Sequence, residues 1–279
     1  MRAARVVLPL MGLAAAAYRA LWWEPRHVRL TSRALELPRW PERLDGLRVA
    51  VIADLHTGAP HVSLSKVERV VARVNAERPD LVALLGDYVD PRVTGATPVP
   101  IAAVASALGR LEAPLGVVAV LGNHDWAEGG REMGSALREA GVTVLENEAV
   151  SVGRGLSVAG VADAGKRRPD LEAALAAVPA DAPVVLLSHN PDVFPDVPER
   201  VSLTLSGHTH GAQVDLPLVR ERVTPSRYGA HYAGGVFEEG DRVLFVSRGV
   251  GTSGLPVRFR APPEVAMLEL TGRERRRAA

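Results

Sequence analysis

Five short segments of the sequence place His, Asp or Asn directly after an apolar run. They are Asp54-Leu55-His56, Gly86-Asp87, Gly122-Asn123-His124-Asp125, Ser188-His189-Asn190 and Gly207-His208-Thr209-His210. Apolar runs of this kind predict buried strands, and α/β sheets gather their functional side chains in loops at the carboxyl ends of strands. We therefore expect the five segments to converge on one crevice.

The residue types in these segments indicate a metal site. Imidazole, carboxylate and amide-oxygen ligands suit manganese, iron, zinc or nickel, and the chain has no cysteine to supply a thiolate. The candidate ligands are Asp54, His56, Asp87, Asn123, His189, His208 and His210. This set exceeds the four ligands of one tetrahedral site. Two divalent ions that share Asp87 would use all seven candidate ligands, because a carboxylate can offer one oxygen to each of two cations.

The spacing of the ligands and the glycines before them lead to two further expectations about the backbone. Asp54 and His56 are two residues apart, as are His208 and His210, so on an extended chain both members of a pair point the same way. The glycines that precede three of the ligands are expected to let the backbone turn sharply where each strand ends.

Two metal ions about 3.5–4 Å apart hold a hydroxide at neutral pH and bind phosphoryl oxygens during in-line displacement. His124, beside the expected ligand Asn123, is then predicted to act as a general acid or as a charge stabiliser. Asp125 is expected to orient the His124 imidazole. Arg248 lies in a glycine-rich turn and is a weaker candidate for binding a substrate phosphate, with an ordinary surface arginine as the equal alternative.

The order of these motifs resembles the calcineurin-like metallophosphoesterases, whose pattern runs D-x-H, G-D, G-N-H-[DE], H and G-H-x-H, and every motif position is matched. Over about residues 45–271, the resemblance implies an α/β fold, a four-layer α/β/β/α sandwich of two mixed sheets. It also implies one metal held by Asp54, His56, Asp87 and His210, and a second held by Asp87, Asn123, His189 and His208.

Within the family, the chain resembles the branch that contains the YaeI and YkuE phosphodiesterases and the LpxG-type UDP-2,3-diacylglucosamine hydrolases. The stretches that carry this resemblance are LDGLRVAVIADLHTG, LLSHNPD, SGHTHGAQVDLP and LFVSRGVGTSGLPVRFRAPPEVAML. Ala53 and Ala212 depart from the Ser and Gly expected there, but neither is a ligand. The resemblance implies phosphodiester or pyrophosphate hydrolysis of a lipid-linked substrate, such as UDP-2,3-diacylglucosamine of lipid A biosynthesis. The alternatives are a phosphodiesterase or phosphatase for soluble substrates and a non-catalytic membrane scaffold.

Hydrophobic periodicity predicts the elements that must position these residues. Short continuous apolar runs predict strands at Arg48–Asp54, Asp80–Asp87, Val117–Gly122, Val184–Ser188 and Val201–Ser206. Apolar residues at helical spacing predict helices over about 63–76, 101–111, 130–140 and 171–178. A hairpin is expected between Val142 and Asp163, and late strands at Gly235–Glu238, Val243–Val246 and Glu264–Leu270. Early βαβ units followed by antiparallel strands predict a mixed-sheet α/β domain.

The chain divides into four segments by composition. A membrane-associating or signal-like segment spans 1–24, a linker and lead-in strand 25–46, the metallophosphoesterase domain 47–271 and a charged tail 272–279. Lys and Arg number 33 against 32 Asp and Glu, for a net charge of +1. This balance lacks the basic footprint of a nucleic-acid binder, so no nucleic-acid partner is expected. The oligomeric state is not predicted.

The apolar N-terminal segment includes Val6–Ala17 and the pair Trp22-Trp23. A membrane anchor, a cleavable signal peptide and a buried core helix are the three interpretations, and membrane association is favoured. The basic lead-in at Arg26, Arg29 and Arg33 suits anionic head groups. If the segment spans a membrane, the positive-inside rule favours a cytoplasmic catalytic domain, whereas a signal peptide would lead to export.

Overall fold

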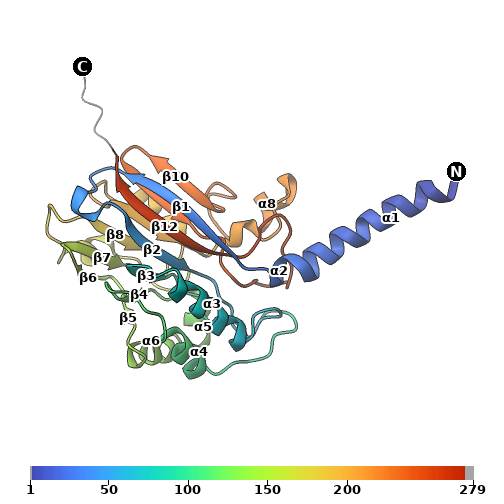
Figure 1. Cartoon of the computed structure of the whole chain (residues 1–279), viewed down its shortest axis with the longest axis horizontal. Coiled ribbons are helices and arrows are strands. Elements are labelled where there is room, and N and C mark those ends of the chain that lie inside the picture. The colour runs from blue at the N-terminus through green and yellow to red at the C-terminus, as the bar shows by residue number, and fades with distance from the viewer. Residues whose placement is uncertain (1, 274–279) are drawn as a thin grey trace, which may run out of the picture.

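The computed structural model describes residues 2–273, with side chains from residue 10 onward. Two six-stranded sheets face each other, and helices cover their outer faces (Figure 1). The strand orders are β1-β12-β2-β3-β4-β5 and β10-β11-β9-β8-β7-β6. The four-layer α/β/β/α sandwich of two mixed sheets predicted from the sequence is confirmed.

The first sheet contains strands from both ends of the chain. Its members are β1 (Arg29–Leu37), β2 (Leu47–Ile52), β3 (Leu81–Leu84), β4 (Val117–Ala119), β5 (Thr143–Val144) and β12 (Glu264–Gly272). The run from β2 through β3 and β4 to β5 is parallel, β12 is antiparallel to β2, and β1 pairs in parallel with β12 along its full length. The lead-in strand is therefore part of this sheet.

The second sheet is parallel at its centre and antiparallel at both edges. Its members are β6 (Glu148–Gly153), β7 (Leu156–Gly160), β8 (Val184–Leu187), β9 (Leu203–Ser206), β10 (Gly235–Glu239) and β11 (Arg242–Val246). The hairpin expected from Val142 consists only of β6 and β7. The preceding β5 pairs with β4 in the other sheet, because it follows a helix that crosses back over the first sheet.

Three apolar layers hold the sandwich together. One core lies between the sheets, and two further cores lie under the helices on either outer face. The helices over the first sheet are α3 (Leu64–Ala76), α4 (Ile101–Leu108) and α6 (Gly130–Glu139), and α7 (Leu171–Leu175) with the 3-10 helix η3 (Pro191–Asp196) covers the second. In α3, Ser63 caps the first turn by accepting from the Lys66 amide. Four buried valines of α3, each worth about 1.5–3 kcal/mol, follow the predicted helical spacing.

Two short α-helices within residues 47–271 were not predicted from the sequence. They are α5 (Asn123–Glu128) and α8 (Pro217–Val223). Helix α5 begins at an expected metal ligand, and α8 follows the last motif segment. Neither is long enough to show helical periodicity in the sequence.

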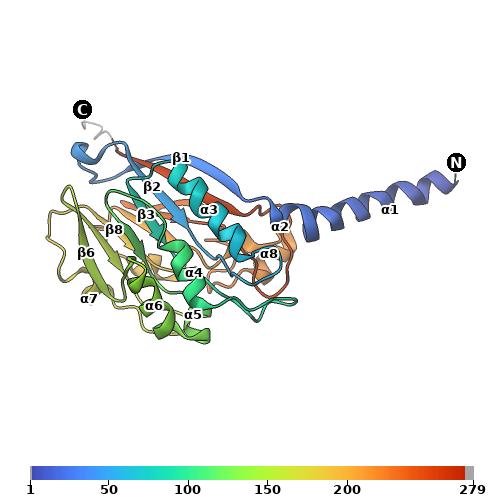
Figure 2. The ribbon, with the colours of Figure 1, turned by 60° about the horizontal axis from the view of Figure 1, so that its bottom comes forward.

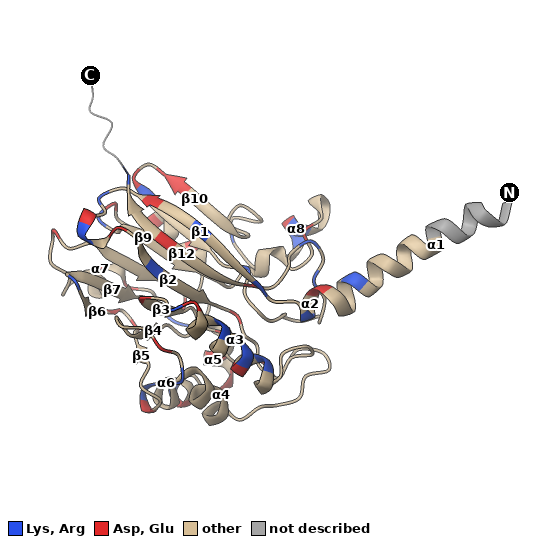
Figure 3. Ribbon diagram, in the orientation of Figure 1, with Lys and Arg blue, Asp and Glu red and all other residues tan. Residues whose placement is uncertain are grey.

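The N-terminal helix points away from the sandwich (Figures 1 and 2). It runs through α1 (Arg2–Tyr18), the π-helical η1 (Arg19–Trp23) and α2 (Glu24–Arg26). Its described side chains from Leu10 to Tyr18 are uncharged, and the charges lie nearer its base (Figure 3). The exposed apolar side chains include Leu10, Met11, Leu13, Leu21, Trp22 and Trp23. The alternative of a buried core helix is therefore wrong. Among the described residues, the structure contains no helix with the length and apolar character needed to cross a membrane.

Candidate active site

The seven expected ligands lie together where strands of both sheets end. Asp54 and His56 follow β2, and Asp87 follows β3. Asn123 begins α5, shortly after β4, while the second sheet supplies His189 after β8 and the pair His208 and His210 after β9. The two facing sheets thus bring together segments more than 150 residues apart in the chain (for example His208 and Asp54, |i−j| = 154).

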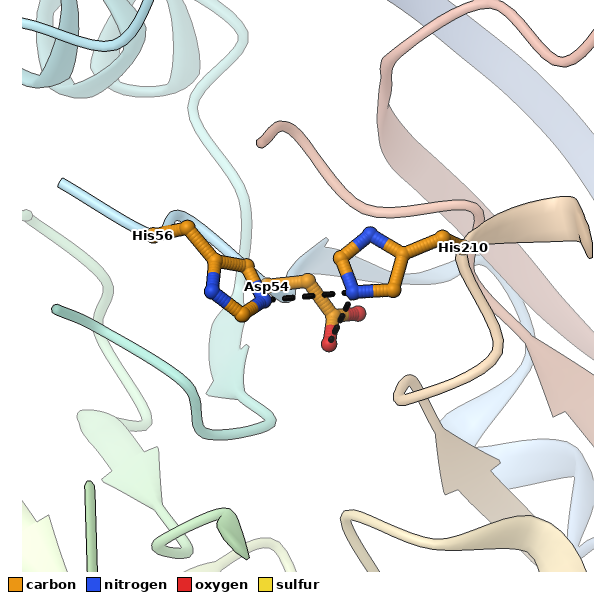
Figure 4. A group of neighbouring side chains, drawn as sticks. All are labelled: Asp54, His56 and His210. Carbon is orange, nitrogen blue, oxygen red and sulfur yellow. Dashed lines mark hydrogen bonds and ion pairs between the residues drawn. The ribbon is translucent and has the colours of Figure 1, made fainter. Parts of the chain in front are cut away.

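One group of side chains contains Asp54, His56 and His210 (Figure 4). The Nε2 atoms of His56 and His210 are 3.2 Å apart, and His210 Nε2 is 3.7 Å from Asp54 Oδ1. Asp87 adjoins this group, since its Oδ2 lies 3.6 Å from His56 Nε2.

A second group contains Asp87, Asn123, His189 and His208. His189 Nε2 is 3.3 Å from Asp87 Oδ2, 3.1 Å from Asn123 Oδ1 and 3.1 Å from His208 Nδ1. The same oxygen of Asp87 therefore faces both groups, whereas its Oδ1 accepts a hydrogen bond from the His124 amide at 2.9 Å. This arrangement differs from the expectation that each oxygen of Asp87 would serve one ion.

These separations fit two cation sites. Metal–nitrogen bonds of 2.0–2.1 Å place neighbouring ligand atoms about 2.8–3.4 Å apart in octahedral or tetrahedral shells, a range that covers the closest separations in both groups. Imidazole nitrogens that face each other at 3.1–3.2 Å also need a proton or a cation between their lone pairs. The donor set is nitrogen and oxygen without sulfur, as expected for a divalent transition metal.

Backbone conformation aims these ligands in a way that the sequence did not indicate. Asp54, His56, Asp87, His208 and His210 all have φ between +45° and +71°. Non-glycine residues rarely adopt this left-handed region, and such strain concentrates at functional sites. The expectation that the i, i+2 pairs lie on extended chain was therefore wrong, because β2 and β9 end before the ligands begin.

The glycines of the motifs serve close packing more than turning. A Cβ on Gly122 would lie 2.2 Å from Asp87 Oδ1, and one on Gly207 would lie 2.6 Å from Asp54 Oδ2. Of the three glycines before ligands, only Gly86, at φ +93°, adopts the left-handed turn that was expected.

Hydrogen bonds on the far side of the imidazoles fix their orientation. The Nδ1 of His189 donates to the Leu85 carbonyl at 2.7 Å, and the Nδ1 of His56 lies 3.2 Å from Asp90 Oδ2. Each contact leaves Nε2 facing the site, as is usual for metal-binding histidines. Asp90 is fully buried, and the sequence analysis missed it. The available signal was its position three residues after Asp87, in the loop that follows β3.

The imidazole of His124 is oriented by Asp90 and not by Asp125. His124 Nδ1 is 2.7 Å from Asp90 Oδ2. Asp125 instead accepts from the backbone amides of Asp87 at 2.7 Å, Tyr88 at 2.8 Å and Gly122 at 2.9 Å. The expected role of Asp125 was wrong because α5 turns its carboxylate back under the chain. Asp125 holds the loop of Asp87 against the start of α5.

His124 presents its other nitrogen, Nε2, toward the expected metal ligands, 4.0 Å from Asp87 Oδ2. The Arg92 guanidinium also lies 2.7 Å from Nδ1, but one nitrogen cannot donate to Asp90 and accept from Arg92 together. The carboxylate is the stronger partner. Burial opposes the charged imidazole, yet the hydrogen bond that His124 Nδ1 donates to Asp90 raises the pKa of His124 above its usual value. This side chain is suited to donate a proton.

The pKa values of two expected ligands, His189 and His208, are shifted in opposite directions. Burial disfavours a charged His189, but the carboxylate of Asp87 raises its pKa to about 10. Burial and the neighbouring His189 lower the pKa of His208 to about 3. A proton on His189 thus offsets Asp87, and a cation would displace that proton.

A cavity of about 390 Å³ opens from this cluster. Its polar end is formed by Asp87, Asn123, His124, His208 and His210. Its apolar wall includes Val214, Val223, Pro225, Leu255 and Val257. Arg248 is not among the lining residues. Its side chain packs against Gly211 and Gly234, beside the His210 segment.

Residues 47–212 match the calcineurin-like phosphoesterase family, and the chain belongs to that family. It is 32% identical over 259 residues to the uncharacterized metallophosphoesterase YkuE of Bacillus subtilis (strain 168), covering 90% of this chain and 88% of that one. It is 35% identical over 234 residues to the phosphodiesterase YaeI of Escherichia coli (strain K12), covering 80% and 82%.

A third relative is the UDP-2,3-diacylglucosamine pyrophosphatase LpxG of Chlamydia trachomatis serovar D, 28% identical over 305 residues and covering 88% of this chain and 90% of that one. The predicted class is thus confirmed: the chain is a metallophosphoesterase, a metal-dependent phosphoester hydrolase. Divalent metal ions follow from the family, and the structure supplies groups of residues that suit them.

Proposed function

We propose that this chain hydrolyses a phosphodiester or pyrophosphate bond in a lipid-linked substrate at a membrane surface, with two divalent ions held by the seven ligands described above. The observation that carries this proposal is the two-sided cavity. Phosphoryl chemistry belongs at its polar end, where His124 lies, and an acyl chain suits the apolar wall beyond it.

The apolar wall continues onto the protein surface. Val223 of α8 is 47% exposed and Leu255 is 60% exposed, an unusual state for large apolar side chains that line one cavity. In both ribbon views α8 lies near the base of the N-terminal helix (Figures 1 and 2). A membrane surface that receives the helix would therefore also meet the mouth of the cavity.

The helix base is bonded directly to the cavity rim. The Arg258 amide donates to the Ala20 carbonyl at 2.9 Å. The fully buried Arg258 guanidinium donates to the carbonyls of Gly251 at 2.9 Å, Ala261 at 2.9 Å and His210 at 3.2 Å. Leu255 and Val257 lie in the same segment. The helix, the apolar wall and a metal ligand thus share one hydrogen-bonded network.

The chain's own residues have distinct roles in the proposed reaction. The seven ligands would hold two divalent ions, which when bound would supply Lewis-acid activation of the phosphoryl group and an activated nucleophile. Asp90 keeps the His124 ring in place. His124 donates a proton to the leaving oxygen or stabilises its charge. The named relatives YaeI, a phosphodiesterase, and LpxG, a pyrophosphatase for UDP-2,3-diacylglucosamine, support a diester or pyrophosphate bond as the target.

The test compares the full chain with a form that begins at residue 18, which keeps η1 and its bond to Arg258. Both are assayed on UDP-2,3-diacylglucosamine in vesicles and on a soluble aryl phosphodiester. We expect the truncation to reduce vesicle binding and kcat/KM for the diacylated substrate, with little change for the soluble one. Equal vesicle binding by both forms would contradict the proposal. Faster turnover of soluble diesters than of any lipid-linked substrate, by both forms, would also contradict it. In either case the chain would be a phosphodiesterase for soluble substrates.

A further inference from the structure

A second cavity lies apart from the metal site, at the base of the N-terminal helix. It measures about 630 Å³ and shares no lining residue with the metal-site cavity. Four of its lining side chains are basic or imidazole groups, namely Arg26, His61, Lys66 and Arg69. None of the described residues that line it is acidic. An anion is the ligand that such a cavity suits.

Lys66 makes the cavity more than a basic surface patch. Its side chain is only 6% exposed, although lysine is almost never buried without a partner. The ammonium donates to the Pro25 carbonyl at 2.9 Å. An ammonium carries three N–H donors, and within residues 10–273 this carbonyl is its one hydrogen-bond acceptor. Two donors remain for a ligand.

The nearby carboxylates each face another arginine. Glu24, buried beside Pro25, accepts from Arg19 Nε through Oε2 at 3.0 Å, while its buried Oε1 has no hydrogen-bond partner among the described residues. Glu68 on α3 accepts from Arg110 at 3.0 Å. Burial and then the charges of Arg258, Arg69 and Arg26 lower the pKa of Lys66 to about 7. A buried cation among other cations is costly in free energy, and a bound anion would offset that cost.

Apolar side chains border this anion site. The Arg26 guanidinium lies over the Trp22 ring, 3.1 Å from its centroid, and the Trp22 ring meets His61 edge-on at 6.3 Å. Trp22 is 52% exposed and Leu21 51%, and the helix continues outward with the exposed side chains of α1. The ligand therefore needs a negative group for the cavity and an apolar part for the helix.

We propose that this cavity binds the phosphate headgroup of an anionic membrane lipid, whose acyl chains lie along η1 and α1. The site is a docking site and takes no part in hydrolysis, so it does not depend on which substrate the metal site accepts. It explains why a buried lysine stands at the base of an apolar helix. It also gives the domain a fixed orientation on the membrane.

The test measures binding of the full-length protein to vesicles of phosphatidylcholine alone and of phosphatidylcholine with phosphatidylglycerol. The first variant is Lys66→Met, which keeps the length of the side chain and removes a buried charge, so the fold is retained. The second is Arg69→Gln, an exposed position that cannot unfold the domain. The matched control is Arg73→Gln, which removes the same charge from α3 one turn beyond Arg69 and outside the cavity.

We expect Lys66→Met and Arg69→Gln each to weaken binding to the anionic vesicles by about fivefold, the factor for one cation at an anionic surface. Binding to phosphatidylcholine and turnover of a soluble phosphodiester should not change. Equal losses in Arg73→Gln, or no loss in Lys66→Met, would overturn the proposal. If inorganic phosphate binds in a Lys66-dependent way while vesicle binding ignores Lys66, the cavity serves a soluble phosphate and the lipid assignment fails.

Discussion

Replacement of Asp90 by asparagine removes the carboxylate that contacts two imidazoles of the active site at once. Asp90 Oδ2 is 3.2 Å from His56 Nδ1 and 2.7 Å from His124 Nδ1. Asparagine has the same shape and keeps one oxygen acceptor, but it carries no charge. The substitution therefore tests the electrostatic contribution of Asp90 with little change in packing.

Two effects of different kind are expected. Loss of the partner of a metal-binding histidine typically costs tenfold to a hundredfold in metal affinity, or about 1.4–2.8 kcal/mol. This loss should fall on one ion of the two, because no candidate metal group that contains His56 includes His189 or His208. The second effect concerns His124, whose pKa is raised by Asp90 against the opposing effect of burial. Without the carboxylate the pKa of His124 falls. As pH rises, His124 therefore loses its proton at a lower pH, and the activity that needs protonated His124 declines there.

Metal content in graded chelator buffers measures the first effect, and kcat against pH at saturating metal measures the second. We expect one tightly held ion instead of two, and an alkaline limb of kcat displaced to lower pH. The control is Asp170→Asn, at the N-cap of α7, where asparagine caps equally well. An Asp90→Asn enzyme with both ions retained and an unshifted alkaline limb would refute the role assigned to Asp90.

Three further substitutions test the site. Asp87→Asn should weaken both ions, because Oδ2 faces both ligand groups, and metal analysis that finds both ions still bound would contradict the bridge. His124→Ala should keep both ions and lower kcat by roughly a hundredfold or more, with a smaller loss on good leaving groups if His124 is the acid; loss of metal would show that it is a ligand. Gly207→Ala should destabilise the fold by about 1–3 kcal/mol, since the added Cβ would lie 2.6 Å from Asp54 Oδ2. The control is Gly12→Ala, because a Cβ added at Gly12 would meet nothing within 4 Å. Equal thermal unfolding midpoints for the two variants would refute the close-approach argument.

The sequence by itself determined which side chains carry the chemistry and which elements precede them. Apolar runs predict buried strands because both faces of a parallel strand are covered, and the valines of α3 predict a helix because their spacing follows 3.6 residues per turn. Residue types alone exclude thiolate ligands and favour nitrogen and oxygen donors. These are local properties, so they can be seen before the chain folds.

Only the tertiary structure decided how the side chains are oriented and which residues hold them in place by hydrogen bonds. The left-handed backbone at Asp54 and His210 is imposed by loops packed from both sheets, and no local pattern of non-glycine residues encodes it. Asp90 supports His56 and His124 because two loops that are distant in sequence meet there, whereas the neighbouring Asp125 is turned back by its own helix. Which charges become neighbours is a property of the fold, because contacts between distant segments depend on how the sheets pack.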